Sequence, residues 1–188
     1  MTDGLFIFVE GDEAMKYKKY IYPITVGFVF IVLLLAFFST QSNPDGSTTE
    51  SRELILNKLS KINGNAHISC EIKIDDYIVS GYISSNNKHG LAIFEPEGNG
   101  KYRFQTNYLR EKDELVYGNI IINQKFYDLF WANKVDIDYV EITYIVSNGS
   151  EETLKLDATD NKIIYKEAPS KDYSVEYVFV DANGNRYE

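Results

Sequence analysis

The single cysteine of the chain, Cys70, is the first candidate for covalent chemistry, because a thiol can act as a nucleophile when a base lies beside it. The nearest base in the sequence is His67, but residues 67 and 70 of a strand point to opposite faces. Cys70 shares its face with three isoleucines, which indicates a buried, inert thiol. The second histidine, His89, lies in the turn "NNKHG", so the two histidines lack metal-ligand spacing.

Pairs of acidic residues are the next candidates, because two carboxylates facing each other across a cleft can supply the acid and the base of a hydrolase. The pairs are Asp75-Asp76, Glu95 with Glu97, Asp113-Glu114 and Glu151-Glu152. Each of them lies at or next to an expected turn, where solvated charge is normal. A cell-envelope hydrolase that uses carboxylates is therefore an alternative hypothesis, and no catalytic residue is assigned.

Two loops carry the oxygen ligands that calcium prefers. The candidate metal-binding residues are Asp157 and Asp160 in "DATDN", and Asp181 and Asn183 in "DANGN". Neither loop has the complete pattern of a known calcium loop, so ordinary turn chemistry is the competing interpretation. No cofactor is expected.

The stretch "KFYDLFWAN", residues 125 to 133, carries four aromatic residues, including the only tryptophan. Alternation alone cannot bury both faces of a surface strand, so either this strand is central or one aromatic face is exposed. Core packing is the favoured interpretation. An exposed face would form a platform for a glycan or a peptide, with Tyr127, Phe130 and Trp131 as the candidate ligand-binding residues.

Apolar residues with a period of two dominate the chain beyond Gly64, which predicts half-buried strands. The expected strands begin with a run at about residues 68–74 and continue at about 77–84, 90–95, 101–108, 114–122, 125–131, 138–147, 152–157, 162–166 and 173–180. Turn signals separate them, and no long helical pattern intervenes. The sequence therefore predicts a mainly β domain, an antiparallel meander that closes into a sandwich or a barrel.

One short amphipathic helix is expected before the strands, at about residues 49–62. Ser47 and Glu50 have the spacing of a capping box, and Asn63-Gly64 is a plausible end.

The stretch "DYSVEYVFVDANGN", residues 172 to 185, alternates Tyr173, Val175, Tyr177 and Phe179 and then turns at Asp181 and Gly184-Asn185. It resembles the last two strands of immunoglobulin-like or fibronectin type III domains of bacterial surface proteins. The preceding "VEITYIVSNGSEETLKL", residues 140 to 156, resembles an earlier hairpin of such a module. The resemblance implies adhesion or interaction rather than catalysis.

Residues 20–38, YIYPITVGFVFIVLLLAFF, contain no charge and are long enough to cross a bilayer as a helix. Tyr20 suits the headgroup zone, Pro23 lies in the first turn, and Phe38 ends the span. Phe37 and Phe38 stand where signal peptidase requires small residues, which favours an uncleaved anchor; cleavage near Thr40 is the alternative.

Three lysines, Lys16, Lys18 and Lys19, precede the span and set its orientation, because basic residues stay on the cytoplasmic side. Met15 begins an ordinary basic leader, whereas residues 1–14 are acidic, so translation is expected to start at Met15. The expected organisation is a cytoplasmic N-terminus at 1–19, a transmembrane helix at 20–38, a linker at 39–48 and an exported β-rich domain at 49–188.

The net charge of −9 argues against a nucleic-acid partner, which requires a basic surface. The sequence thus predicts a single-pass protein of the bacterial cell membrane whose C-terminal domain lies outside the cytoplasm. A non-enzymatic domain that binds a protein or cell-envelope partner is the first hypothesis. An envelope hydrolase and a structural part of a membrane assembly are the alternatives.

Overall fold

The computed structural model describes residues 45–59, 61–62, 64–110, 115–134 and 136–188. All of them belong to the second of two compact units of the chain, Pro44–Glu188. The described elements are the helix α2 (Thr49–Asn57), the strands β1 (Ala66–Ile74), β2 (Tyr77–Ser84), β3 (His89–Gly98), β4 (Lys101–Arg110), β5 (Leu115–Ile122), β6 (Lys125–Ala132), β7 (Ile137–Val146) and β8 (Glu151–Asp157), the 3-10 turn η1 (Thr159–Asn161), and the strands β9 (Ile163–Glu167), β10 (Tyr173–Asp181) and β11 (Arg186–Tyr187).

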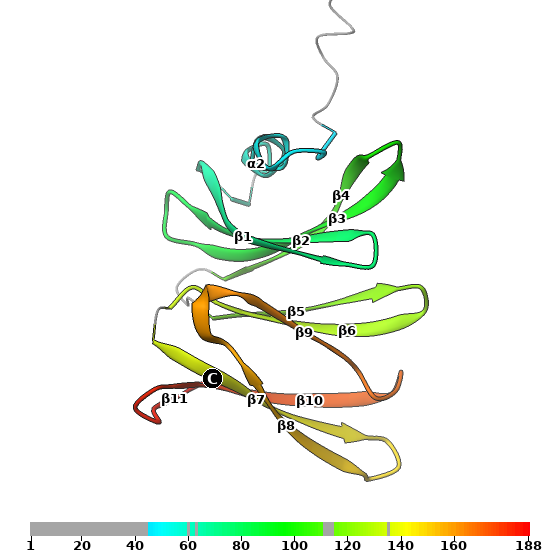
Figure 1. Cartoon of the computed structure of the whole chain (residues 1–188), viewed down its shortest axis with the longest axis vertical. Coiled ribbons are helices and arrows are strands. Elements are labelled where there is room, and N and C mark those ends of the chain that lie inside the picture. The colour runs from blue at the N-terminus through cyan, green and yellow to red at the C-terminus, as the bar shows by residue number, and fades with distance from the viewer. Residues whose placement is uncertain (1–44, 60, 63, 111–114, 135) are drawn as a thin grey trace, which may run out of the picture. The chain divides into compact units, whose positions relative to one another are not determined.

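The strands form three antiparallel sheets. Sheet A has the order β1-β2-β3-β4, sheet B the order β5-β6-β9, and sheet C the order β11-β10-β7-β8. Figure 1 shows the layers of this unit in sequence: α2, sheet A, sheet B and sheet C. Three apolar clusters fill the interfaces between successive layers. The mainly β, antiparallel and sandwich-like prediction is confirmed, but the sequence did not predict a third sheet.

The helix α2 begins at Thr49, as predicted, but its N-cap residue lies one position later than the predicted cap. Thr48, not Ser47, is the N-cap residue, and its hydroxyl accepts a hydrogen bond of 3.2 Å from the Ser51 amide. The Ser51 hydroxyl in turn accepts from the Thr48 amide at 3.1 Å, so the capping box is Thr48 with Ser51 rather than Ser47 with Glu50. The helix ends at Asn57, whose side-chain oxygen accepts from the Ala66 amide of β1.

An ion pair between Arg52 and Glu71 fastens α2 to sheet A. Two guanidinium nitrogens donate to the two carboxylate oxygens, over 2.8 and 2.6 Å, and Arg52 is only 5% exposed. A third nitrogen donates to the Gly46 carbonyl at 2.6 Å. Burial alone would raise the pKa of Glu71, but hydrogen bonds from Arg52 and Ser80 outweigh it, so the pKa is lowered.

The strand β6 lies at the centre of sheet B and is buried on both faces. Tyr127, Leu129 and Trp131 belong to the cluster between sheets A and B, whereas Phe130 belongs to the cluster between sheets B and C. Trp131 also donates from its indole nitrogen to the Asn161 side chain at 2.9 Å. A strand between two covering sheets explains why "KFYDLFWAN" lacks the apolar-polar alternation of a surface strand.

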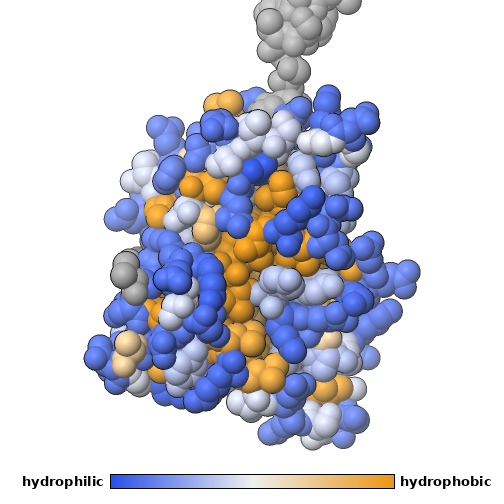
Figure 2. All heavy atoms as spheres, viewed as in Figure 1, coloured by the Kyte–Doolittle hydropathy of each residue, from blue (hydrophilic) through white to orange (hydrophobic). Residues whose placement is uncertain are grey.

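Hydrophilic side chains cover most of the face drawn in Figure 2. Figure 2 shows one face, on which a band of hydrophobic side chains crosses the middle of the molecule between hydrophilic margins. Among the described residues, the exposed large hydrophobic side chains are Leu54, Ile121 and Tyr165. They lie on three different elements, α2, β5 and β9.

The predicted membrane anchor lies outside the described residues. This applies to Tyr20, Pro23 and Phe38 of the span and to the flanking Lys16, Lys18 and Lys19. Within residues 45–188, as far as the structure describes them, no helix combines the length and the apolar character that crossing a membrane requires.

Candidate functional site

A surface cavity of about 580 Å³ lies along sheet C, where none of the described strands neighbours β10 on one side for most of its length. We call it the edge pocket. Its lining residues come from β7, β10 and β11 and the segment that follows: Glu141, Thr143, Val175, Glu176, Tyr177, Val178, Arg186 and Glu188. Three carboxylates and one guanidinium give this lining a net negative charge.

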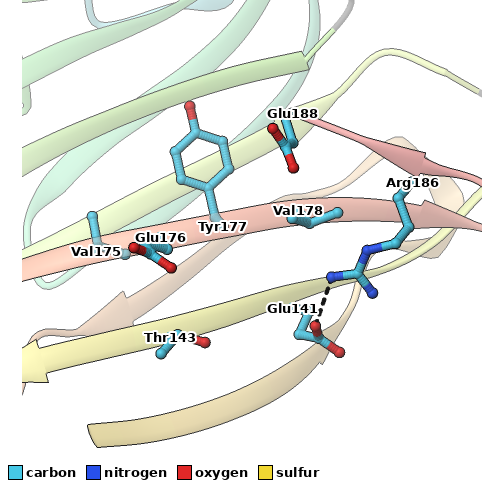
Figure 3. Close-up of a pocket in the computed structure, with 8 residues that line it drawn as sticks. All are labelled: Glu141, Thr143, Val175, Glu176, Tyr177, Val178, Arg186 and Glu188. Atoms are coloured by element: carbon cyan, nitrogen blue, oxygen red, sulfur yellow. Dashed lines mark hydrogen bonds and ion pairs between the residues drawn. The ribbon is translucent and has the colours of Figure 1, made fainter.

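An ion pair crosses the edge pocket between Arg186 and Glu141. Figure 3 shows the Arg186 side chain reaching from β11 past β10 toward Glu141 on β7, where the donor and acceptor are 2.8 Å apart. Lys155 of β8 lies 3.5 Å from the same carboxylate on its other side. Arg186 and Lys155 together hold the pKa of Glu141 below its usual range.

The remaining acids of the edge pocket, Glu176 and Glu188, form no ion pair among the described residues. Tyr177 points the other way from Glu141, toward sheet B, and stacks on Tyr117 with ring centroids 4.8 Å apart. A second, smaller cavity of about 130 Å³ adjoins here, because Tyr177 and Glu188 line it together with Arg110 and Leu115. The end of β4 and the start of β5 thus border this smaller cavity.

Asp181, a predicted metal ligand, organises the hairpin that carries Arg186 in this structure. Its carboxylate accepts four hydrogen bonds: from the amides of Asn183 and Asn185 at 2.9 and 2.8 Å, from the Asn185 side chain at 2.7 Å and from the Tyr187 hydroxyl at 3.0 Å. These bonds, led by that of the Asn185 side chain, lower the pKa of Asp181. The Asn183 amide, rather than its side chain, is the group that takes part.

The other predicted metal loop is also arranged as a turn. Asp157 accepts hydrogen bonds from the Thr159 amide and hydroxyl and forms an ion pair with Lys162. Lys162 and Thr159 lower the pKa of Asp157 to about 2. Asp160 is exposed and has a positive φ of 65°. In the described part of the chain, no three side chains of the types Asp, Glu, His and Cys lie close enough to hold a metal ion.

The candidate aromatic residues do not lie on the surface. Phe130 and Trp131 have no exposed area and Tyr127 is 7% exposed. In this structure they fill two cores, on opposite faces of β6, and none of them lines the edge pocket. These buried positions agree with core packing, which was the favoured interpretation of "KFYDLFWAN".

Cys70 and the two histidines also lie away from the edge pocket. Burial raises the pKa of the Cys70 thiol to about 11, which leaves little thiolate at neutral pH. His67 is exposed and lies 3.0 Å from Glu53 of α2, and His89 lies 3.1 Å from Asn133. None of these contacts pairs the thiol with a base.

A buried carboxylate that was not predicted from the sequence lies between sheets B and C. Asp128 has no exposed area, and its Oδ1 accepts hydrogen bonds from Tyr117 at 2.7 Å and Tyr173 at 2.9 Å. The buried hydroxyl of a third residue, Tyr144, and the Asp128 Oδ2 make no hydrogen bond of ordinary geometry. Burial, and then the Asp128 carboxylate, raise the pKa of Tyr117 and Tyr144. One aspartate inside "KFYDLFWAN" was the signal that could have revealed this cluster.

Comparison of the chain with models of protein families, with curated proteins and with solved structures finds no match. Any inference about function therefore depends on the arrangement of the site itself. The edge pocket combines fixed charge, one aromatic ring and a strand edge. Such a surface suits recognition, whereas general acid catalysis requires a carboxyl group with a raised pKa, and that of Glu141 is lowered.

Proposed function

We propose that the β unit is a non-enzymatic binding module that contacts a protein or cell-envelope partner through the edge pocket. The observation that carries this proposal is the lining of the pocket, where carboxylates and a guanidinium surround the free side of β10. Charged groups fixed around a strand edge favour a partner with complementary charge and an extended backbone.

The strand order supports an immunoglobulin-like module at residues 115–188. If β5 to β11 are lettered A to G in chain order, sheet B contains A, B and E, and sheet C contains C, D, F and G. An immunoglobulin constant domain divides its seven strands into ABED and CFG, so one strand, the fourth, changes sheets. The hairpin of β10 and β11, whose sequence resembles the last two strands of such modules, supplies strands F and G.

A membrane tether forms the second part of the proposal. The uncharged span at 20–38 is long enough to cross a bilayer, and Lys16, Lys18 and Lys19 before it favour a cytoplasmic N-terminus. The proposed protein is therefore a single-pass membrane protein that presents the edge pocket outside the cytoplasm. Its partner would lie in the envelope or on a neighbouring membrane protein.

A carboxylate hydrolase is supported less well by the same pocket. Its most enclosed acid, Glu141, is neutralised from both sides by Arg186 and Lys155, and a low pKa makes it a poor proton donor. A structural role in a membrane assembly is a special case of the proposed binding function.

Affinity capture from membranes, with the full chain as bait, tests the binding function. We expect a stable partner to be retained by the natural chain and lost from a variant with Glu141→Lys and Glu176→Lys in the edge pocket. A matched variant with two reversed charges on β8, Glu151→Lys and Glu152→Lys, should retain it. Equal retention by both variants would place binding elsewhere on the protein.

Topology is tested separately with reporter enzymes fused after residue 188. A reporter that is active only outside the cytoplasm should be active on the natural chain and lose most activity when Lys16, Lys18 and Lys19 are all replaced by glutamate. A reporter that is active only inside the cytoplasm should show the reverse. Activity of the cytoplasmic reporter on the natural chain would reject the proposed orientation.

A further inference from the structure

We infer that the free edge of β10 receives an extended segment of a partner protein, and that this segment carries lysine or arginine opposite Glu176. This inference rests on the proposed binding function and specifies its mode: a strand added to sheet C. It names the chemistry of the partner, which the proposed function leaves open.

The backbone of β10 offers hydrogen-bonding groups on this side. The Asp172 carbonyl, next to the start of β10, accepts a hydrogen bond from the Ser147 amide, next to the end of β7. The peptide groups of Asp172 therefore face β7. Peptide groups of an antiparallel strand alternate between its two sides, so those of Tyr173, Val175 and Tyr177 face away from β7. The strand β11 pairs only with Phe179 and Val180. No other described strand covers the three outward peptide groups.

The short strand β11 already shows how a strand at this edge places a cation. Arg186 lies opposite Val180 and sends its guanidinium across β10 to Glu141, which is the partner of Val178 in the register. Glu176 lies on the same face of β10 as Val178 and Val180, because side chains two residues apart share a face. A strand that extends the line of β11 would present alternate side chains to Glu176 in the same way.

Charge selects the occupant of this edge. Glu176 and Glu188 have no ion pair among the described residues, so a basic side chain would find two carboxylates near its path. A second copy of the chain, paired through its own β10 edge, would bring two sets of these acids together and be repelled. The complementary occupant is therefore a basic segment of another protein.

Two peptides of equal length serve as probes: one alternates lysine with valine, and the other alternates glutamate with valine. The measurement is residue-specific amide hydrogen exchange of the full chain in detergent micelles. We expect the lysine peptide, but not the glutamate peptide, to slow exchange of the Tyr173, Val175 and Tyr177 amides. Glu176→Lys should weaken binding of the lysine peptide at least about tenfold, which corresponds to about 1.4 kcal/mol. The matched reversal Glu151→Lys on β8 should change it less than about twofold.

A backbone variant separates strand addition from simple charge attraction. Val175→Pro removes one outward N–H while sparing the side that pairs with β7, a substitution that edge strands tolerate. It should abolish the protection of Tyr173 and Tyr177 by the lysine peptide. Protection that survives Val175→Pro, or lysine-peptide binding that Glu176→Lys leaves unchanged, would overturn the inference. A membrane partner that is captured without protecting these amides would overturn it too, and would leave the proposed binding function intact.

Discussion

The Tyr117 hydroxyl donates a hydrogen bond of 2.7 Å to Oδ1 of Asp128, and both groups lie in the interface between sheets B and C. A fully buried carboxylate is costly unless hydrogen bonds replace its hydration. Tyr173, on β10, donates to the same oxygen at 2.9 Å, so the aspartate joins β5, β6 and β10. This cluster fixes how sheet C lies on sheet B.

Replacing Asp128 with alanine should lower the free energy of unfolding by about 2–4 kcal/mol, because two tyrosine hydroxyls lose their buried acceptor. Asp128→Asn should cost less, since its amide oxygen still accepts. Tyr144→Phe is the control and should change stability by less than about 1 kcal/mol, because its hydroxyl makes no well-formed hydrogen bond. Denaturant titrations followed by the fluorescence of Trp131 measure all three. Equal losses for the alanine and asparagine variants would contradict this account.

Stability should fall at alkaline pH. Burial and the nearby carboxylate raise the pKa values of Tyr117, Tyr144 and Tyr173, so these phenols stay protonated in the folded chain after they ionise in the unfolded chain. Above a pH of about 10 the unfolded state therefore binds fewer protons than the folded state, and stability decreases as pH rises. For the fully buried Tyr144 the slope approaches about 1.4 kcal/mol per pH unit.

Unfolding titrations between pH 8 and pH 12, with tyrosinate absorbance recorded in parallel, test this pH dependence. Asp128→Asn should make the alkaline decline shallower, because it removes the negative charge. A steeper fall of stability with pH in that variant would show that another group controls the alkaline loss of stability.

Arg52→Ala should lower the free energy of unfolding by about 2–4 kcal/mol, because it leaves the Glu71 carboxylate without its main partner. Arg52→Lys keeps the charge but cannot donate two parallel bonds and also reach Gly46, so it should lose roughly half as much. The lowered pKa of Glu71 means that its contribution is present above a pH of about 4.5 and is lost as the pH falls further. Chemical denaturation at pH 7 and pH 3 should therefore show a smaller effect of Arg52→Ala in acid.

Cys70 should resist alkylation in the folded chain. With a pKa of about 11 instead of 9, the thiolate fraction at pH 8 is about 100-fold smaller than for an ordinary thiol. Iodoacetamide labelling followed by mass spectrometry should be slow in buffer, fast in denaturant, and faster in buffer as the pH approaches 11. Ser174→Cys, combined with Cys70→Ser, places the thiol at an exposed site and should react at the ordinary rate. Equal rates for the two sites would refute burial of Cys70.

The strands were predictable because their signals are local. Alternating residues and turn formers placed β1 to β10 within a few residues of their bounds, and "DYSVEYVFVDANGN" gave the β10 and β11 hairpin. The cap of α2 was misplaced by one residue because two neighbouring hydroxyls, Ser47 and Thr48, can each serve. In "KFYDLFWAN" both faces are apolar, so the sequence favoured core packing and kept an exposed platform as the alternative.

The edge pocket could not be derived from the sequence, because its geometry depends on register. Arg186 and Glu141 are 45 positions apart, and only the pairing of β10 with both β7 and β11 brings them together. The metal prediction at Asp181 stays a prediction, but it did identify a carboxylate with an unusual local role in this structure. Two backbone amides, a side-chain amide and a hydroxyl donate hydrogen bonds to the Asp181 carboxylate oxygens.

Sheets B and C are interleaved along the chain: β9 completes sheet B only after β7 and β8 of sheet C, and β10 then returns to sheet C. During translation, the β5-β6 and β7-β8 hairpins must therefore both leave the ribosome before β9 can complete sheet B. Until then Trp131 on β6 lacks its neighbouring strand β9. No single cut after Leu115 separates two intact sheets. In a library of random truncations, fragments that retain cooperative unfolding should consequently end before β5 or extend through β10, with few in between.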